Sequence, residues 1–115
     1  MELISRMDSG VQVLAANGRI DHSRASAFEA SLAPFLQNCC ASHTPLVLDF
    51  SGVDFISSVG LRVLMLAAKQ VKAQRGKIAV ASLSPIVSEI FQVSRFNLVL
   101  DVFESTEVAI STLTP

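Results

Sequence analysis

The chain has 115 residues, of which half are apolar and 17% are charged, and its formal net charge is −1. This length predicts one domain, residues 1–115, and the balanced charge argues against disorder and against nucleic-acid binding. The apolar runs are too short to span a membrane and the N-terminus lacks the pattern of a signal peptide, so we expect a cytoplasmic protein without a membrane partner.

The first segment predicts a β-hairpin. Two β-prone runs, residues 3–7 and 11–16, flank a turn-forming cluster at residues 8–10. Asn17-Gly18 is expected to end the second run.

A helix follows the hairpin, with Ser23 as the expected N-cap. Its apolar face consists of Ala25, Phe28, Leu32, Phe35 and Leu36. Pro34 lies inside this pattern and predicts a kink or an early end. The adjacent Cys39 and Cys40 are expected to be reduced, because neighbouring cysteines rarely bridge, and neither histidine stands at a zinc-binding spacing from them.

The middle of the chain carries the most informative pattern. Residues 46–50 are apolar without alternation, which is typical of a strand buried on both faces. A turn of small residues is expected over 51–58, and helical spacing of apolar residues then predicts a helix over 58–75. Gly76 stands where a left-handed residue would end that helix.

The second half predicts a strand over 77–81, a short helix over 86–93 and a last strand over 99–103. Ser84, followed by Pro85, is the expected N-cap of the short helix, and Ser105 is the expected N-cap of a final helix. The alternation predicts an α/β fold with a mixed sheet of about five strands, which opens with the hairpin and packs against about four helices.

Two serines, Ser57 and Ser58, lie where the helix over 58–75 begins. The free backbone N–H groups and the partial positive charge of a helix start stabilise a phosphate as well as a capping hydroxyl. Either serine is therefore a candidate for phosphorylation, and a plain N-cap is the alternative interpretation.

The outward face of this helix is predicted from a rotation of 100° per residue. It consists of Arg62, Val63, Leu66, Lys69, Gln70 and Ala73. Val63 and Leu66 would then form a small apolar docking patch near Ser58, unless a neighbouring segment covers one of them.

Catalytic patterns do not emerge from the sequence. Residues 52–60 lack the glycine spacing and terminal lysine of a phosphate-binding loop, and no nucleophile elbow or triad pattern is present. Asp21, Asp49 and Asp54 could in principle bind a metal, but ordinary turn-capping roles are favoured. We therefore expect no enzyme activity, no cofactor and no metal site.

The segment around the two serines reads Asp49-Phe-Ser-x-Val-Asp-Phe-Ile-Ser-Ser-Val-Gly-Leu61. This motif resembles the signature of the STAS domain, in the branch of bacterial anti-sigma factor antagonists. Further matches are Gly18-Arg-Ile-Asp21, Gly76-Lys-Ile-Ala-Val80, Ser84-Pro85, Ile90-Phe91 and Ser94-Arg-Phe96. The resemblance spans nearly the whole chain and implies a STAS-type single domain.

The resemblance also implies a function and its residues. Ser58 matches the serine that a partner kinase phosphorylates, while Ser57 replaces the family's acidic residue and is an alternative acceptor. The implied partners are an ATP-binding anti-sigma factor serine kinase and a PP2C-type phosphatase, both on separate chains, with this protein acting as a monomer. The expected partner-binding residues are Asp21, Ser57, Ser58, Val59, Gly60, Arg62, Val63 and Leu66.

Unphosphorylated protein would bind the kinase-type anti-sigma factor and release its sigma factor, and phosphorylation would end this binding. Two alternatives stay open. One is a STAS adaptor without phosphorylation, for example in a lipid-transport complex. The other is a sensor that binds a nucleotide or small ligand near Asp21 and Ser58.

Overall fold

The computed structural model describes residues 3–39 and 44–114. Five strands form one sheet in the order β1-β2-β3-β4-β5. β1 pairs antiparallel with β2, and the remaining neighbours pair in parallel. The elements are β1 (Ile4–Asp8), β2 (Val11–Ile20), α1 (Ala25–Gln37), β3 (Leu46–Ile56), α2 (Ser58–Ala73), β4 (Ile78–Ala81), α3 (Pro85–Val93), the 3-10 helix η1 (Phe96–Leu98), β5 (Asp101–Phe103) and α4 (Thr106–Leu113). The predicted mixed sheet with an opening hairpin and four α-helices is confirmed.

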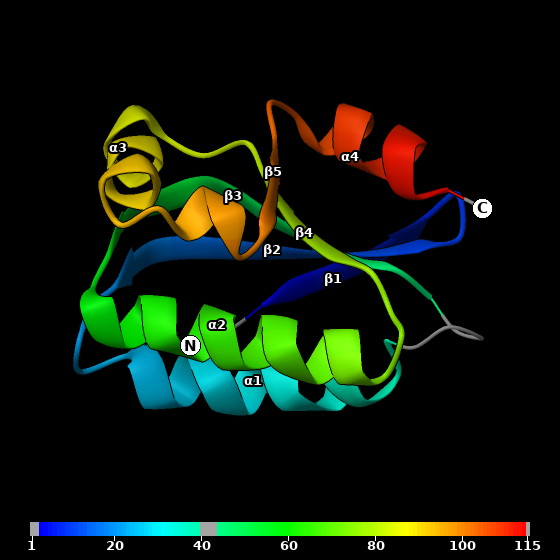
Figure 1. Cartoon of the computed structure of the whole chain (residues 1–115), viewed down its shortest axis with the longest axis horizontal. Coiled ribbons are helices and arrows are strands. Elements are labelled where there is room, and N and C mark those ends of the chain that lie inside the picture. Colours follow the sequence, from blue (N-terminus) through cyan, green and yellow to red (C-terminus); the bar gives the residue numbers. More distant parts are fainter. Residues whose placement is uncertain (1–2, 40–43, 115) are drawn as a thin grey trace.

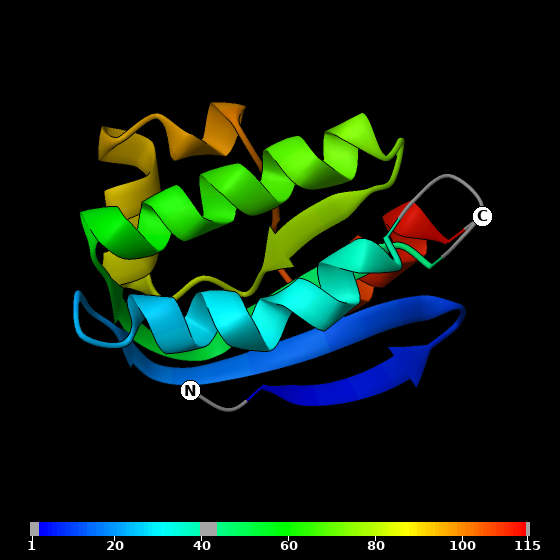
Figure 2. The same ribbon diagram turned by 90° about the horizontal axis from the view of Figure 1, so that it is seen from below.

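The helices cover both faces of the sheet. Figure 1 shows α1 and α2 on one face and α4 on the other, with α3 at one end of the sheet. Figure 2 shows α1 and α2 lying side by side. On the central strand β3, Leu48 and Phe50 belong to the core under α1 and α2, whereas Val47 belongs to the smaller core under α4. The prediction that this strand is buried on both faces is therefore confirmed.

Both β2 and β3 are longer than predicted. β2 continues past Asn17-Gly18 to Ile20, and β3 continues through the expected turn to Ile56, because the two strands stay paired as far as Ile20 and Ile56. The pairing is irregular where the small residues lie. Gly18 has a φ of +88°, and a Cβ on Gly52 would stand 1.9 Å from Asn17 Oδ1. These glycines permit a close, uneven strand pair that the local sequence did not predict.

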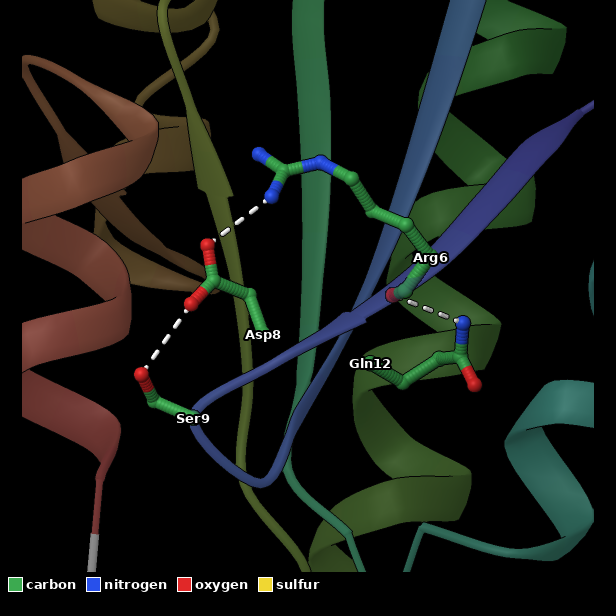
Figure 3. A network of polar contacts seen from close by, with 4 residues as sticks. All are labelled: Arg6, Asp8, Ser9 and Gln12. Carbon is green, nitrogen blue, oxygen red and sulfur yellow. Dashed lines mark hydrogen bonds and ion pairs between the residues drawn. The ribbon is translucent and has the colours of Figure 1, made fainter.

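The opening hairpin is held by polar contacts at its turn (Figure 3). Asp8 accepts a 2.9 Å ion-paired hydrogen bond from Arg6 Nη1 and a 3.0 Å bond from Ser9 Oγ. Gln12 Nε2 donates across the strands to the Arg6 carbonyl at 3.1 Å. Ser9 and Gly10 both have positive φ, as a tight two-residue hairpin turn requires. The contacts are exposed, so they contribute little stability and mainly define the register.

The helix ends correct three predictions. Arg24, and not Ser23, occupies the N-cap position of α1. Of the two outcomes expected at Pro34, a kink or an early end, the early end was wrong, because α1 runs past Pro34 to Gln37. The left-handed residue after α2 is Arg75, with a φ of 63°, and not Gly76. Gly76 N instead donates to Val71 O at 2.9 Å, closing a Schellman motif.

The later elements follow the prediction more closely. Ser84 and Ser105 are the N-caps of α3 and α4, as expected. The last strand is shorter than predicted because its expected first residues follow η1, where Phe96 packs edge-on against Phe91 with ring centroids 5.2 Å apart. In the described part of the chain, no helix is long and apolar enough to cross a membrane.

Gln74 joins the C-terminal ends of α1 and α2. Its Nε2 donates to Leu36 O at 2.7 Å and to Cys39 O at 2.8 Å, thereby satisfying carbonyls at the end of α1. The Cys39 side chain is buried beside this contact, and its Sγ donates to Lys77 O at 3.1 Å. Cys39 is thus a buried cysteine in a polar contact, whereas Cys40 lies outside the described residues.

We expect Gln74→Ala to lower the free energy of unfolding by about 1–2 kcal/mol, because Cys39 O and Leu36 O each lose a hydrogen bond, although Leu36 O keeps a second one, from Cys39 N. The measurement is urea unfolding followed by circular dichroism. Lys72→Ala, an exposed change in the same helical turn, is the control and should alter stability by less than about 0.5 kcal/mol. Equal effects of the two substitutions would contradict the role assigned to Gln74.

Candidate functional site

The end of β2 and the start of α2 meet at one end of the sheet. Ser57 N donates a hydrogen bond to Ile20 O at 2.9 Å. Because Asp21 follows Ile20 directly, this bond sets the turn between β2 and α1 beside the two serines. The structure thus brings the predicted site residues before α1 and those at the start of α2 into one region.

The two candidate serines have different environments. Ser57 is the N-cap of α2: its Oγ accepts from Gly60 N at 3.1 Å, and its carbonyl accepts from Leu61 N at 2.9 Å. Ser58 is the first residue of the helix and is exposed. Among the described residues, its hydroxyl has no hydrogen-bond partner. Ser57 is therefore engaged in capping, and Ser58 presents a free hydroxyl.

Gly60 allows α2 to approach the sheet closely. A Cβ at this position would stand 2.8 Å from Ile56 Cγ1 and 2.9 Å from Ile20 Cγ2. It would also stand 3.2 Å from the Ile20 carbonyl oxygen, which accepts the bond from Ser57. Gly60 is buried and offers no side chain to a partner, so its role is to let the start of α2 pack closely on the sheet.

Asp21 organises the turn in which it lies. Its Oδ1 accepts from Ser23 Oγ at 2.8 Å and from Arg24 N at 3.2 Å, and its carbonyl accepts from Ala25 N at 3.1 Å. The Ser23 hydrogen bond, followed by the Arg24 amide and the charges of Arg24 and Arg19, lowers the pKa of the Asp21 carboxyl group. Within residues 3–39 and 44–114, no hydrogen bond joins Asp21 to Ser58, so its interactions are those of a turn-stabilising residue.

The outward face of α2 is narrower than predicted. Val63 is only 7% exposed, so its predicted place on the surface was wrong, whereas Leu66 is 43% exposed as expected. The reason is that α2 packs against both the sheet and α1, which widens its buried stripe. Arg62 is exposed and Val59 is partly buried. The exposed strip of α2 near the site therefore consists of Ser58, Arg62 and Leu66.

A hollow of about 470 Å³ lies beside this strip. It is lined by Ser58, Val59, Leu61, Arg62, Met65 and Phe96. The sequence did not place Phe96 near Ser58, because Phe96 comes from η1, far along the chain. Leu61 and Met65 are partly buried, pack against the core and also line the hollow. The site thus combines a free hydroxyl, a guanidinium and an apolar depression.

The acidic residues do not form a metal site in the described part of the chain. No group of three histidine, cysteine, aspartate or glutamate side chains there is placed to hold an ion. Asp49 has a local role, because its Oδ1 accepts from Ser51 N at 3.0 Å.

Comparison with known proteins places this chain in a family. The model of the STAS domain matches residues 3–109. A Bordetella bronchiseptica protein named "Putative anti-sigma factor antagonist BtrV" is 33% identical over 109 residues, which are 95% of this chain and 91% of that protein. The chain therefore belongs to the STAS domain family, in the branch of anti-sigma factor antagonists.

Solved structures agree on the fold. An anti-sigma factor antagonist from Mycobacterium paratuberculosis superposes with a TM-score of 0.87 at 21% identity, over 99% of this chain and 94% of that one. The Bacillus cell fate determinant SpoIIAA in its phosphorylated form superposes with a TM-score of 0.68 at 19% identity, over 96% of this chain and 98% of that one.

The distinct roles of the two serines can be tested by stability. We expect Ser57→Ala to lower the free energy of unfolding by about 1 kcal/mol, because α2 loses its N-cap hydrogen bond. Ser58→Ala removes an unbonded, exposed hydroxyl and should change it by less than about 0.5 kcal/mol. Chemical unfolding of both variants measures the difference, and the reverse order would contradict the assignment of the cap.

Gly60→Ala should lower the free energy of unfolding by about 1–3 kcal/mol, because the added methyl group meets Ile20 and Ile56. Alanine also has a higher helix propensity than glycine, by up to about 1 kcal/mol, and we expect the steric loss to outweigh this gain. Unfolding in urea measures it, with Ser58→Ala as a control that raises helix propensity without a contact. A Gly60→Ala variant more stable than the unmodified protein would show that α2 can shift away from β2.

Proposed function

We propose that this anti-sigma factor antagonist works as a binding module that a charge switches off. In this proposal the unphosphorylated protein binds a kinase-type anti-sigma factor, which then releases its sigma factor. The kinase phosphorylates Ser58, binding ends, and a PP2C-type phosphatase on another chain restores the active form. The module acts as a monomer in the cytoplasm and needs no cofactor of its own.

The observation that carries this proposal is the free, exposed hydroxyl of Ser58 at the first position of α2. A kinase must reach the acceptor oxygen, and Ser58 offers it without breaking an existing hydrogen bond. Ser57 would have to give up its bond to Gly60 N, which makes it the poorer acceptor. The Bacillus protein SpoIIAA, which shares the fold, is itself described in a phosphorylated form.

The docking face in this proposal is built around the exposed strip of α2. Ser58, Arg62 and Leu66 contact the partner directly, with Val59 at the adjoining hollow and Asp21 in the neighbouring turn. Ser57 and Gly60 hold the start of α2 in place, and buried Val63 supports it from within. An apolar depression beside polar and cationic side chains suits a protein partner that inserts an apolar group.

A phosphate on Ser58 would add a charge of about −1.5 to −2 to this face. A partner that closes over the strip must then remove water from that charge, which is costly where no cation of the partner faces it. Each loss of about 1.4 kcal/mol lowers affinity tenfold. A single phosphate is thus sufficient to turn tight binding into release.

The test is affinity capture from a lysate of the native bacterium with three baits: the unmodified protein, Ser58→Ala and Ser58→Asp. We expect the first two to retain an ATP-binding anti-sigma factor and Ser58→Asp to lose it, because the added carboxylate lies in the interface. Retained proteins are identified by mass spectrometry.

Ser111→Asp is the matched control, because Ser111 is exposed on α4, on the opposite face of the sheet. It should retain the same partner as the unmodified protein. Retention of one partner by all the baits, or of a membrane transport complex, would contradict the switch and favour an adaptor without phosphorylation.

A further inference from the structure

Arg62 stands one helical turn after Ser58, on the same exposed strip of α2. Both side chains are exposed and line the same hollow of about 470 Å³. The single ion pair in residues 3–39 and 44–114 joins Arg6 and Asp8, so Arg62 has no acidic partner there. A free guanidinium thus lies beside the free hydroxyl of Ser58.

The spacing of these two residues suits a charge pair. Residues four apart on a helix have Cβ atoms about 5–6 Å from each other, and the favourable order places the negative group nearer the N-terminus. Ser58 and Arg62 have this order. A phosphate offers several acceptor oxygens, and the planar guanidinium can bind two of them at once.

The helical neighbours of Arg62 carry no charge that would compete with a phosphate for its guanidinium group. Val59 and Met65, three residues before and after it, and Leu66, four residues after it, are uncharged. The remaining wall of the hollow is contributed by Leu61 and Phe96, which are also uncharged. A phosphate on Ser58 would therefore find Arg62 as the cation within the hollow.

We propose that Arg62 is the intramolecular partner of the phosphate on Ser58. This inference rests on the proposed function and adds a second effect to the switch. Before phosphorylation, the guanidinium is available to a carboxylate of the bound partner. After phosphorylation, it is held by the phosphate of its own chain, so the docking face gains a negative group and loses a free cation at once.

The experiment uses purified full-length protein with phosphoserine incorporated at position 58 during translation, so no kinase is needed. Titration followed by ³¹P NMR gives the second pKa of the phosphate in the unmodified background and in Arg62→Gln, Arg62→Lys and Lys69→Gln. Lys69→Gln is the matched control, since it removes one exposed positive charge from α2 about 16 Å along the helix from Ser58, beyond the screening length.

We expect Arg62→Gln to raise the phosphate pKa by about half a unit, because the dianion loses its cation. Lys69→Gln should leave it unchanged, and Arg62→Lys should restore part of the shift. The charged or titratable groups of the neighbouring segments are the same in every variant, so their effects on the phosphate pKa cancel. They are Asp21, His22 and Arg24 in the turn before α1, and Arg95 in the segment that leads to Phe96. Melting curves of each variant confirm that it is folded.

Equal pKa values in Arg62→Gln and Lys69→Gln would overturn the inference. That outcome is distinct from failure of the proposed function, because the capture experiment tests partner release without reference to Arg62. A higher phosphate pKa in Arg62→Gln than in the unmodified background would establish the pair, even if capture showed that another residue controls binding. This difference in pKa should become smaller in 1 M salt, as expected for an exposed ion pair.

Discussion

The hydrogen bond from Ser57 N to Ile20 O is the constraint on which the site depends. It fastens the first residue before α2 to the last residue of β2, two segments separated by the whole of α1. Gly60 lets the helix come close enough for this bond, because any side chain there would meet Ile20 and Ile56. The turn that carries Asp21 and the start of α2 are thereby held at one end of the sheet.

The two serines at the start of α2 have different roles: Ser57 caps the helix, and Ser58 has an exposed hydroxyl that is free in the described part of the chain. Ser57 is an uncharged N-cap, whereas aspartate, a comparably good N-cap, would place a carboxylate at this position. A neutral cap also means that a phosphate on Ser58 has no carboxylate directly before it. The start of α2 would therefore stabilise the proposed phosphate on Ser58 more than it would with an acidic cap.

The packing of α2 decides which of its residues a partner can reach. The sheet covers one side of the helix and α1 covers another, so Val63 is buried and the exposed strip is reduced to Ser58, Arg62 and Leu66 near the site. These residues recur every four positions and form a single line along the helix. In the proposed function, this line of a hydroxyl, a cation and an apolar group is the surface that a partner recognises and that phosphorylation of Ser58 changes.

The order of the α-helices and strands, the buried central strand and the caps at Ser84 and Ser105 could be predicted from the amino-acid sequence, because apolar periodicity and capping residues act locally. The family was indicated by the resemblance of its motifs and not by these patterns. The sequence placed Ser57 and Ser58 at a helix start but did not separate their roles. The extension of β2 and β3 through small, turn-prone residues could not be predicted, since it depends on pairing between strands that are distant in sequence. Only the tertiary structure decided that Val63 is covered by packing and that Phe96 reaches the hollow beside Ser58, because both depend on segments distant in sequence.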